Sequence, residues 1–513
     1  MLQISHLTLT HRKDLHVLIE DFSFVLNRGD KAVLIGEEGN GKSTLLKWIY
    51  DPSMVEGYAD FSGSRTTQGE LLGYLPQELP ERDRQKPVYR YFSELPAFER
   101  TDPSELHRIA KSLHFTPDLF YSDQTMDSLS GGERVKVQVA GLLLSRPDIL
   151  LLDEPSNDID IETLEWMEKM ICDFPGSVLF ISHDETLIER TANRVILIEQ
   201  LRRKTRPRVT TADMSFRTFM ESRRRSFAKQ EQEALSERRD EKKAMERFRR
   251  IQQSVEQEQN TVSRQDPHGG RLLKKKMKAV KSMEKRYERE HGQMTEMPET
   301  EAAITIRFTR QRQLPAGKIV LDYSLPELYS PSGTVLAKNI SLYIRGPEKI
   351  CITGTNGIGK TTLIREIAKQ LLSRKDVHAC YMPQDYADLL PMEKTPAEFL
   401  APSGNKNEQT MVRTFLGSMK YTPEEMFRPI RELSGGQKAK LLLLKMSLTE
   451  ADVLILDEPT RNFSPLSAPE VRQILSGFPG AVISISHDRK YIEEVCEKVY
   501  RLNRTGLILI QNG

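Results

Sequence analysis

The 513-residue sequence lacks any apolar run approaching the roughly 18–20 residues that a membrane-spanning helix requires. Its first 21 residues, MLQISHLTLTHRKDLHVLIED, do not contain a basic region followed by an uninterrupted apolar stretch, so they do not match a secretion signal. There are only four cysteines (Cys172, Cys351, Cys380 and Cys496), and no two of them form a CxxC pair. These absences argue against a membrane span, a zinc ribbon, an iron–sulfur cluster and a disulfide framework, and they favour the cytoplasm.

Charge is abundant and is distributed unevenly along the chain. Lys and Arg together number 75, against 73 Asp and Glu, so the formal net charge is only +2. Residues 201–290 nevertheless contain 27 basic and 14 acidic side chains, a local net charge of +13, and the remainder of the chain carries −11. A basic segment between two acidic bodies favours a polyanionic partner, and RNA is the obvious candidate.

A phosphate-binding motif occurs twice. The apolar runs KAVLIG and KICITG lead into GEEGNGKS at 36–43 and GTNGIGKT at 354–361, and each loop is followed by a helical pattern. Both loops match G-x-x-x-x-G-K-[ST] in its strand–loop–helix context. The glycines allow backbone N–H groups to surround phosphate oxygens, and the helix N-terminus adds positive potential. We therefore expect Lys42 to reach the β- and γ-phosphates of ATP and the Ser43 hydroxyl to ligate Mg²⁺.

Further motifs follow the two loops at matching distances. LSGGE at 129–133 corresponds to LSGGQ at 433–437, ILLLDEP corresponds to VLILDEP, and ISHD occurs in both halves. The interval from the motif serine to the second acid of DE is 24 residues in both halves, and the interval from that acid to the histidine is 29 residues in both. Such conserved internal spacing predicts a duplicated domain.

This set of motifs resembles that of the ABC ATPase superfamily, in two complete copies. LSGGE and LSGGQ are similar to its signature motif, YLPQ and YMPQ to its Q-loops, the apolar strands ending in two acids to its Walker B motifs, and SHD to its H-loop. The resemblance implies a head-to-tail arrangement in which each ATP lies between two cassettes. Site 1 would pair the loop at 36–43 with Ser434, Gly435 and Gly436, and site 2 would pair the loop at 354–361 with Ser130, Gly131 and Gly132.

The same resemblance implies a role for each motif residue. Glu154 and Glu458 would orient or deprotonate the attacking water, and His183 and His487 would stabilise charge at the γ-phosphate. The remaining nucleotide-binding residues would be Gly36, Gly39, Gly41, Lys42, Ser43, Thr44, Gln77, Gly354, Gly357, Gly359, Lys360, Thr361, Thr362 and Gln384. The ligands of Mg²⁺ would be Ser43, Gln77, Asp153, Thr361, Gln384 and Asp457.

Two features depart from the family pattern. The loop after the second acid contains Asn157 and Asp160 in the first half, but Arg461 and Ser464 at the matching positions of the second half. Because this loop usually crosses to the other ATP site, the resemblance implies that the two sites are coupled unequally. No aromatic residue suited to stack on adenine is evident in the first half, and Tyr329 is the candidate in the second.

The basic segment has its own pattern. We predict a helix over 213–258, a turn over 260–270 with Pro267, Gly269 and Gly270 as helix breakers, and a second helix from Arg271. Each helix carries apolar residues at seven-residue intervals: Met220, Phe227, Ala234, Phe248 and Val255 on the first, and Leu273, Val280 and Tyr287 on the second. The predicted hairpin therefore has apolar seams on a charged surface. The alternative is a solvated, partly disordered charged linker.

Cations gather beside the predicted tip of this hairpin. The residues that we expect to bind RNA are Arg264, His268, Arg271, Lys274, Lys275, Lys276 and Lys278. Two cassettes joined by a basic helical hairpin resemble the ABC-F family over essentially the whole chain. Members of that family act on ribosomes: the ATP-closed form occupies the tRNA exit site, and the hairpin points at P-site tRNA and the peptidyl-transferase centre. The run LDEPTRNFSPLS is similar to the branch that protects ribosomes from lincosamides, pleuromutilins and streptogramin A.

The sequence thus predicts an α/β fold with two P-loop ABC nucleotide-binding domains, at 1–210 and 301–513, joined by a basic helical-hairpin linker at 211–300. The expected activity is ATP hydrolysis with Mg²⁺. The expected partners are large-subunit rRNA and P-site tRNA, with no membrane partner, for a cytoplasmic monomer whose two cassettes dimerise internally. The alternatives are a housekeeping ABC-F translation factor and the tandem ATPase subunit of a membrane importer. A DNA-repair ATPase fits less well, because long coiled coils within a cassette and zinc modules are both missing.

Overall fold

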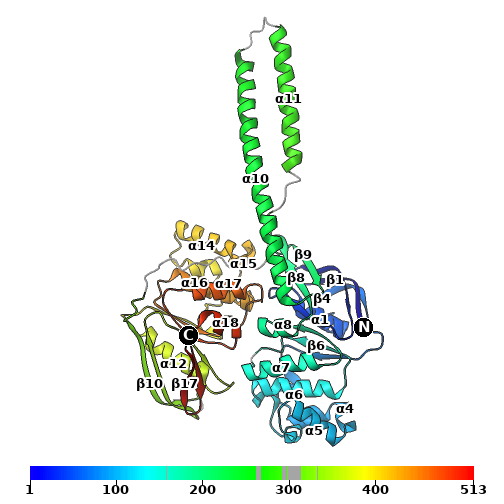
Figure 1. Cartoon of the computed structure of the whole chain (residues 1–513), viewed down its shortest axis with the longest axis vertical. Coiled ribbons are helices and arrows are strands. Elements are labelled where there is room, and N and C mark those ends of the chain that lie inside the picture. The colour runs from blue at the N-terminus through cyan, green and yellow to red at the C-terminus, as the bar shows by residue number, and fades with distance from the viewer. Residues whose placement is uncertain (158, 262–266, 292–296, 298–313, 332, 513) are drawn as a thin grey trace. The chain divides into compact units, whose positions relative to one another are not determined.

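The computed structural model describes residues 1–157, 159–261, 267–291, 297, 314–331 and 333–512. Two compact units are present, Met1–Phe216 together with Glu301–Gly513, and Arg217–Thr300. The first unit contains two similar α/β bodies, which we name cassette 1 (residues 1–216) and cassette 2 (the described residues from 314 onward) (Figure 1). The second unit is named the arm. The predicted fold class is confirmed, and the proposed three-domain boundaries stay a prediction.

Cassette 1 is built on a six-stranded sheet with the order β5-β6-β7-β3-β8-β9, in which only β9 is antiparallel to its neighbour. Its strands are β3 (Lys31–Ile35), β5 (Leu72–Leu75), β6 (Ile149–Asp153), β7 (Ser177–Ile181), β8 (Arg194–Gln200) and β9 (Arg206–Ala212). A separate antiparallel sheet has the order β2-β1-β4, formed by β1 (Leu2–His11), β2 (Val17–Leu26) and β4 (Ala59–Thr66).

Cassette 2 repeats this plan with the order β13-β14-β15-β12-β16-β17, again with only the last strand antiparallel. Its strands are β12 (Lys349–Thr353), β13 (Ala379–Met382), β14 (Val453–Asp457), β15 (Ala481–Ile485), β16 (Lys498–Asn503) and β17 (Gly506–Asn512). The second sheet is here the hairpin of β10 (Ile319–Tyr329) and β11 (Val335–Arg345).

The helices of the cassettes lie between these strands in the sequence. In cassette 1 they are α1 (Lys42–Tyr50), α2 (Glu81–Arg84), α3 (Val88–Ser93), α4 (Pro96–Arg100), α5 (Pro103–Ser112), α6 (Gly131–Leu144), α7 (Ile161–Asp173), α8 (Glu185–Thr191) and α9 (Leu201–Lys204). In cassette 2 they are α12 (Lys360–Leu372), α13 (Pro396–Leu400), α14 (Lys406–Ser418), α15 (Pro423–Phe427), α16 (Gly435–Leu448), α17 (Ala468–Ser476) and α18 (Arg489–Val495). Short 3₁₀ turns are η1 (Pro52–Met54), η2 (Pro117–Tyr121), η3 (Met126–Ser128), η4 (Tyr386–Asp388) and η5 (Ile430–Glu432).

The central strands place the motif residues at one edge of each sheet. Every residue of β6, β7, β14 and β15 is buried, as continuous apolar runs in parallel strands covered on both faces should be. The carboxyl ends of parallel strands meet at the same sheet edge, where doubly wound folds bind ligands. Asp153 ends β6 and Asp457 ends β14, so each pair of acids is held at that edge.

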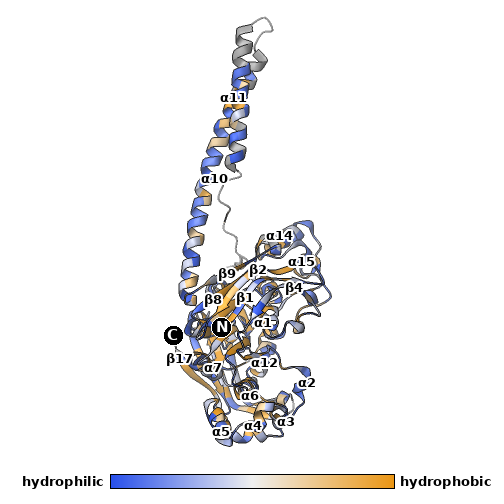
Figure 2. Ribbon diagram, turned by 90° about the vertical axis from the view of Figure 1, so that its right-hand side faces the viewer, coloured by the Kyte–Doolittle hydropathy of each residue, from blue (hydrophilic) through white to orange (hydrophobic). Residues whose placement is uncertain are grey.

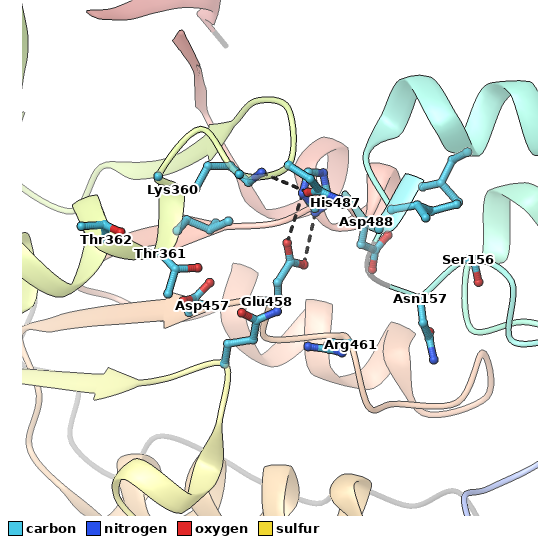
Figure 3. A pocket seen from close by; sticks show the side chains of 18 of the residues that line it. Ser156, Asn157, Lys360, Thr361, Thr362, Asp457, Glu458, Arg461, His487 and Asp488 are labelled. Atoms are coloured by element: carbon cyan, nitrogen blue, oxygen red, sulfur yellow. Dashed lines mark hydrogen bonds and ion pairs between the residues drawn. The ribbon is translucent and has the colours of Figure 1, made fainter. Parts of the chain in front are cut away.

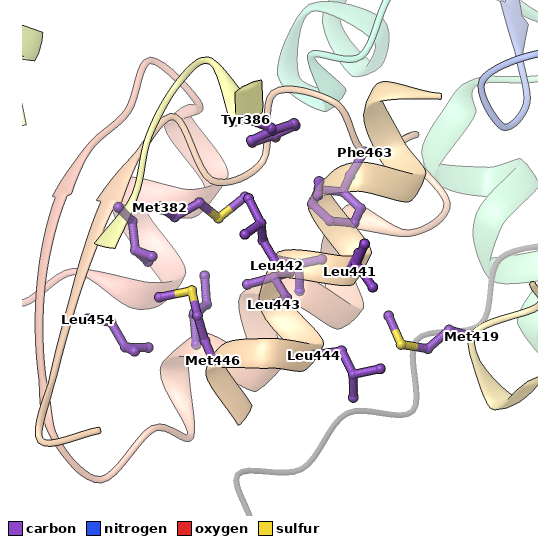
Figure 4. Close-up of a cluster of buried hydrophobic side chains, with 14 of the residues drawn as sticks. Met382, Tyr386, Met419, Leu441, Leu442, Leu443, Leu444, Met446, Leu454 and Phe463 are labelled. Carbon is purple, nitrogen blue, oxygen red and sulfur yellow. The ribbon is translucent and has the colours of Figure 1, made fainter. Parts of the chain in front are cut away.

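The helix that follows the signature motif of cassette 2, α16, is held in place by the hydrophobic core around it. Four consecutive leucines, Leu441 to Leu444, are each no more than 4% exposed, so α16 is surrounded by protein on all sides. They belong to a cluster that includes Met382, Tyr386 and Phe463 (Figure 4). Because this helix is embedded, its N-terminus after Ser434 has a fixed position relative to the sheet.

The arm is a pair of long helices, α10 (Phe216–Thr261) and α11 (Pro267–His291). At 46 residues, α10 is about 70 Å long at ~1.5 Å per residue. Both helices are mostly hydrophilic, with scattered apolar residues (Figure 2). On the predicted seam of α10, Ala234, Phe248 and Val255 are at most 9% exposed. These three seam positions are therefore buried, which disfavours the alternative of a solvated, partly disordered linker for this part of α10.

One boundary prediction in the arm is wrong. The turn was expected to extend over 260–270 with the second helix starting at Arg271, whereas α10 continues to Thr261 and α11 already begins at Pro267. Proline is well suited to a first helical position because its missing N–H would be unpaired there in any case. Pro267 thus starts the helix, and Gly269 and Gly270 lie in its first turn.

No helix among the described residues is long and apolar enough to span a membrane.

Candidate functional site

The two phosphate-binding loops have the same backbone form. Gly41 and Gly359 both occupy the N-cap of the following helix with φ of 85° and 101°, the left-handed region that favours glycine. A Cβ on Gly41 would come within 3.0 Å of Leu18, and one on Gly359 within 2.8 Å of Leu336. Glycine is therefore required at both positions for conformation and for space.

The loop lysines turn back onto their own loops. Lys42 Nζ donates to the carbonyl oxygens of Gly36 and Glu37, at 2.9 Å each, and Lys360 Nζ donates to those of Gly354 and Thr355 at 2.7 and 3.0 Å. Each ammonium group is thereby held close to its loop, and the backbone N–H groups at the N-terminus of the following helix lie at the end of the same loop. This is an anion site of the kind that binds nucleotide phosphates.

In cassette 1 the Walker B acids already have partners. Ser43 Oγ donates to Asp153 Oδ1 at 2.8 Å, and the Tyr74 hydroxyl donates to Oδ2 at 3.2 Å. Burial raises the pKa of Asp153 to about 6. A hydroxyl beside a buried carboxylate supplies the hard oxygen ligands that Mg²⁺ prefers, so the donor set fits that ion.

Glu154 is surrounded by donors. Gln77 Nε2 donates to its Oε2 at 2.8 Å, Asn157 Nδ2 donates to the same oxygen at 2.5 Å, and His183 Nε2 lies 3.4 Å from Oε1. Burial raises the pKa of Glu154, but the hydrogen bond and charge of His183 outweigh burial and lower it to about 2. The predicted Q-loop, Walker B and H-loop residues of cassette 1 are therefore brought together.

The corresponding site of cassette 2 is an open cavity of about 620 Å³ between the cassettes (Figure 3). Among its lining residues are Gly131 of the first signature motif and His183, which both come from cassette 1. The predicted residues of cassette 2 that line it are Gly357, Gly359, Lys360, Thr361, Thr362, Gln384, Asp457, Glu458 and His487. Ser330 and Pro331 line the cavity too, whereas Tyr329, the candidate for adenine stacking, is not among the described lining residues.

The acids of this cavity are less well paired. Both carboxylate oxygens of Asp457 are buried without a hydrogen-bond partner among the described residues, and burial raises its pKa to about 6. Burial and the neighbouring charge of Asp457 raise the pKa of Glu458 to about 8. Burial and then the charge of Lys360 lower the pKa of His487 to about 4, so its ring is neutral at pH 7. A buried carboxylate with the Thr361 hydroxyl as its neighbour fits a Mg²⁺ ligand set.

Backbone strain marks the second acid of each Walker B motif. Glu154 and Glu458 have φ of 50° and 53°, in the left-handed region that a side chain with a Cβ rarely adopts. Such residues concentrate at functional sites, where the surrounding structure holds them in place. The conformation turns each carboxylate toward the histidine that follows the next strand, His183 or His487.

The signature motifs begin helices with matching caps. Ser130 and Ser434 each form a capping box at the N-terminus of α6 and α16, with Glu133 and Gln437 as partners. The glycines that follow leave their N–H groups at the positive end of a 14-residue helix dipole. Gly436 N–H is already used, because it donates to the Glu38 carboxylate of the facing cassette at 2.6 Å.

The loops after the Walker B motifs cross between the cassettes, as the resemblance implied. Asp160 accepts a hydrogen bond from the backbone N–H of Asn356 in the loop of cassette 2. In the opposite direction, Ser464 Oγ donates to Glu37 Oε1 at 2.5 Å. His183 Nδ1 also lies 2.9 Å from the carbonyl oxygen of Phe463. The two cassettes thus share both sites.

An ion-pair network at the cassette interface was not found from the sequence. Arg472 of α17 donates to Glu185 at 2.6 and 3.3 Å, and both side chains are at most 7% exposed. Arg489 Nη2 donates to Asp184 at 3.0 Å, and Lys490 Nζ donates to Glu185 at 3.2 Å. Cations of cassette 2 meet anions of cassette 1. Asp184, Glu185, Arg489 and Lys490 lie in or beside the two ISHD motifs, whereas Arg472 lies in a separate helix and has no such signal.

The predicted RNA-binding residues lie on or near α11 of the arm. Lys274, Lys275 and Lys278 are exposed, and Lys276 is half-buried. Lys274 and Lys278 share one helix face, because residues four apart lie above one another. Arg264 lies outside the described residues, and so do the side chains of His268 and Arg271.

Comparisons with known proteins agree with this geometry. The family model described as "ABC transporter" matches residues 19–157 and 337–461, together more than half of the chain. The ATP-binding protein Uup of Escherichia coli (strain K12) is 26% identical, over 96% of this chain and 79% of its own length. The ribosome protection protein VmlR of Bacillus subtilis (strain 168) is 27% identical, over 94% of this chain and 83% of its own length.

A similar fold occurs among solved structures. The chain matches one from the complex of archaeal ribosomal stalk protein aP1 and the archaeal ribosome recycling factor aABCE1. The match has a TM-score of 0.59 and 16% identity, and covers 98% of this chain and 90% of that one. At this identity the likeness concerns the fold of the tandem cassettes.

Proposed function

The chain belongs to the ABC transporter family and is an ATPase, and we propose that within this family it is an ABC-F protein that acts on ribosomes. The observation that carries the proposal is the combination of two complete ATP sites with a basic helical arm between them in the sequence. The similarity to a ribosome protection protein over 94% of the chain supports it. We place the protein in the cytoplasm, as a monomer whose cassettes close on each other.

Each residue set then has a task in the reaction. Lys42 and Lys360 bind the terminal phosphates, and the signature serines and glycines of the facing cassette bind the γ-phosphate. Ser43, Gln77 and Asp153 would hold Mg²⁺ at site 1, and Thr361, Gln384 and Asp457 would hold it at site 2, where the ion would supply positive charge beside the phosphates. Glu154 and Glu458 orient the attacking water and accept its proton, while His183 and His487 stabilise the charge that develops on the γ-phosphate.

The cycle couples this chemistry to ribosome binding. ATP holds the two cassettes together, because each nucleotide contacts both, and the closed form binds the tRNA exit site of the ribosome. The arm then contacts large-subunit rRNA and P-site tRNA through the lysines of α11, since phosphates are bound chiefly by Lys and Arg. Hydrolysis removes the bridging γ-phosphate, and the protein is released.

We further propose that the result of binding is protection from antibiotics that occupy the peptidyl-transferase centre, with lincosamides, pleuromutilins and streptogramin A as the expected classes. Support comes from the run LDEPTRNFSPLS and from the similarity to VmlR. The arm would displace tRNA and remodel the drug pocket. A housekeeping translation factor uses the same ribosome site without changing drug susceptibility, and an importer subunit uses a membrane partner.

Expression in a drug-sensitive bacterium tests these alternatives together. We expect the protein to sediment with ribosomes and not with membranes, and to raise resistance to at least one of the three drug classes. Replacing Lys274, Lys275, Lys276 and Lys278 by glutamine should abolish that resistance, because it removes the phosphate-binding charges near the arm tip. The readouts are sedimentation profiles and inhibitory drug concentrations.

A matched variant controls for charge alone. Neutralising Arg238, Arg239, Lys242 and Lys243, four exposed cations in the middle of α10, removes the same charge elsewhere on the arm and should preserve most of the resistance. Sedimentation with membranes would point to an importer subunit. Sedimentation with ribosomes without any change in susceptibility would leave the housekeeping role and overturn the drug-protection proposal.

A further inference from the structure

The two phosphate-binding loops differ at three positions that the motif leaves open, and at two of these the first loop has an acid. Glu37 and Glu38 of the first loop stand where the second loop has Thr355 and Asn356. A carboxylate next to the site of a triphosphate repels it, so two acids are an unfavourable choice for a loop that binds ATP. The contacts of Glu37 and Glu38 with cassette 2 indicate a different role for these two acids.

Glu38 occupies the anion-binding end of the facing signature helix. Its Oε2 accepts the N–H of Gly436 at 2.6 Å, and its Oε1 lies 3.3 Å from where a Cβ of Gly435 would be. These are the groups that the family resemblance assigns to the γ-phosphate of site 1. A carboxylate has the charge and the acceptor oxygens that a helix N-terminus favours, so Glu38 satisfies α16 without a nucleotide.

Glu37 is anchored beside it. Lys440 Nζ, only 8% exposed on α16, lies 3.3 Å from Glu37 Oε2, and the hydroxyls of Ser464 and Ser467 both donate to Oε1. Burial raises the pKa of Glu37, but the charge of Lys440 and the two hydroxyls lower it to about 2. The side chain is therefore an ionised carboxylate that links the loop of cassette 1 to three residues of cassette 2.

Site 2 has the opposite arrangement. Its loop contains no acid, and the acid comes from the crossing loop, where Asp160 accepts from the Asn356 N–H. At site 1 the crossing loop has Ser464 at the position of Asp160. At each site, therefore, the acid comes from only one of the two facing loops: the phosphate-binding loop at site 1 and the crossing loop at site 2. The cavity of about 620 Å³ is at site 2.

We propose that Glu37 and Glu38 form an internal anion latch at site 1. Glu38 occupies the N-terminus of the signature helix that would bind the γ-phosphate, and Glu37 ties the loop of cassette 1 to cassette 2 without nucleotide. To enter site 1, ATP must displace the Glu38 carboxylate from the signature helix and loosen the contacts of Glu37 beside it, whereas the loop of site 2 lines a cavity of about 620 Å³. ATP binding and turnover therefore take place first at site 2. This inference rests on ATP hydrolysis by the cassettes and is independent of any ribosomal role.

Calorimetric titration of the full chain with ATP and Mg²⁺ tests the latch. Glu154→Gln and Glu458→Gln are introduced together so that bound ATP is not hydrolysed. One ATP should bind tightly, and the second about 10- to 100-fold more weakly, the range expected for replacing hydrogen bonds to a charged group. Adding Lys360→Ala should remove the tight site, because that lysine belongs to site 2.

The decisive variant gives site 1 the residues of site 2. Glu37→Thr with Glu38→Asn should bring the two affinities within about threefold of each other, by strengthening the weaker one. Glu37→Gln with Glu38→Gln, which keeps the size of both side chains, should act in the same direction. Glu56→Gln, at an exposed carboxylate of cassette 1 outside the sites, should leave the difference between the sites as it was.

Two results would overturn the latch. Two equally tight sites before any change in the loop would show that Glu37 and Glu38 do not obstruct ATP. An affinity difference that persists in both loop variants would show that its cause lies elsewhere. Either result would leave ribosome binding untested, so failure of the latch and failure of the proposed function are distinguishable.

Discussion

Replacing Glu458 by glutamine is expected to lower steady-state ATP hydrolysis by about 10²–10⁴-fold, the usual contribution of a general base. Glutamine keeps the size of the side chain but cannot accept the proton of the attacking water. The position is well defined, since Glu458 lines the cavity with Lys360, Asp457 and His487. Phosphate release from ATP by the purified full-length protein is the measurement.

The matched variant is Glu154→Gln at the other site. Because site 1 is closed by Glu37 and Glu38, we expect this substitution to reduce the rate less than Glu458→Gln does. If the two single variants lowered the rate of ATP hydrolysis equally, both sites would contribute equally to hydrolysis. A Glu458→Gln protein with a normal rate would exclude Glu458 as the base.

Replacing Arg472 by alanine is expected to destabilise the nucleotide-free protein by about 3–5 kcal/mol, as breaking a buried ion pair usually does. The substitution leaves the Glu185 carboxylate, 7% exposed, without its bidentate partner, and Lys490 is then the cation that remains beside it among the described residues. It also removes a contact between the cassettes. Thermal unfolding, with and without ATP, reports the loss.

Two controls separate burial from charge. Arg428→Ala removes a cation from an exposed pair with Glu424 and should change stability little, because exposed ion pairs contribute little. Replacing both Arg472 and Glu185 by apolar residues of similar size should recover most of the stability, since no buried charge is then left unpaired. A single Arg472→Ala variant as stable as the parent would contradict this assignment of the interface.

The fold class could be predicted from the sequence, and so could the clustering of the ATP-binding motifs in space. The phosphate-binding loop, Walker B and H-loop motifs each follow directly after a strand. Because the carboxyl ends of parallel strands lie at the same edge of the sheet, these motifs meet there. Asp153 and Ser43, which are 110 residues apart, are therefore in contact as the motifs suggested. The crossing of Asp160 and Ser464 to the facing loops was likewise implied by the family resemblance.

The features that the sequence did not reveal depend on contacts between distant segments. Glu37 and Glu38 stand at positions that the loop motif leaves unspecified, and their partners in cassette 2 lie about 400 residues away in the chain. The pairing of Arg472 with Glu185 spans 287 residues and has no local pattern. The start of α11 at Pro267 is hard to predict for a different reason, because a proline can either break a helix or begin one.

The central claim is that ATP controls binding to the ribosome, and purified components test it most directly. The Glu154→Gln/Glu458→Gln protein is mixed with bacterial ribosomes and sedimented with ATP or with ADP. We predict co-sedimentation with ATP, little with ADP, and weaker binding as salt rises, with a log–log slope of about 0.7–0.9 per neutralised phosphate. Failure of the trapped protein to sediment with ribosomes in ATP at low salt would contradict the account.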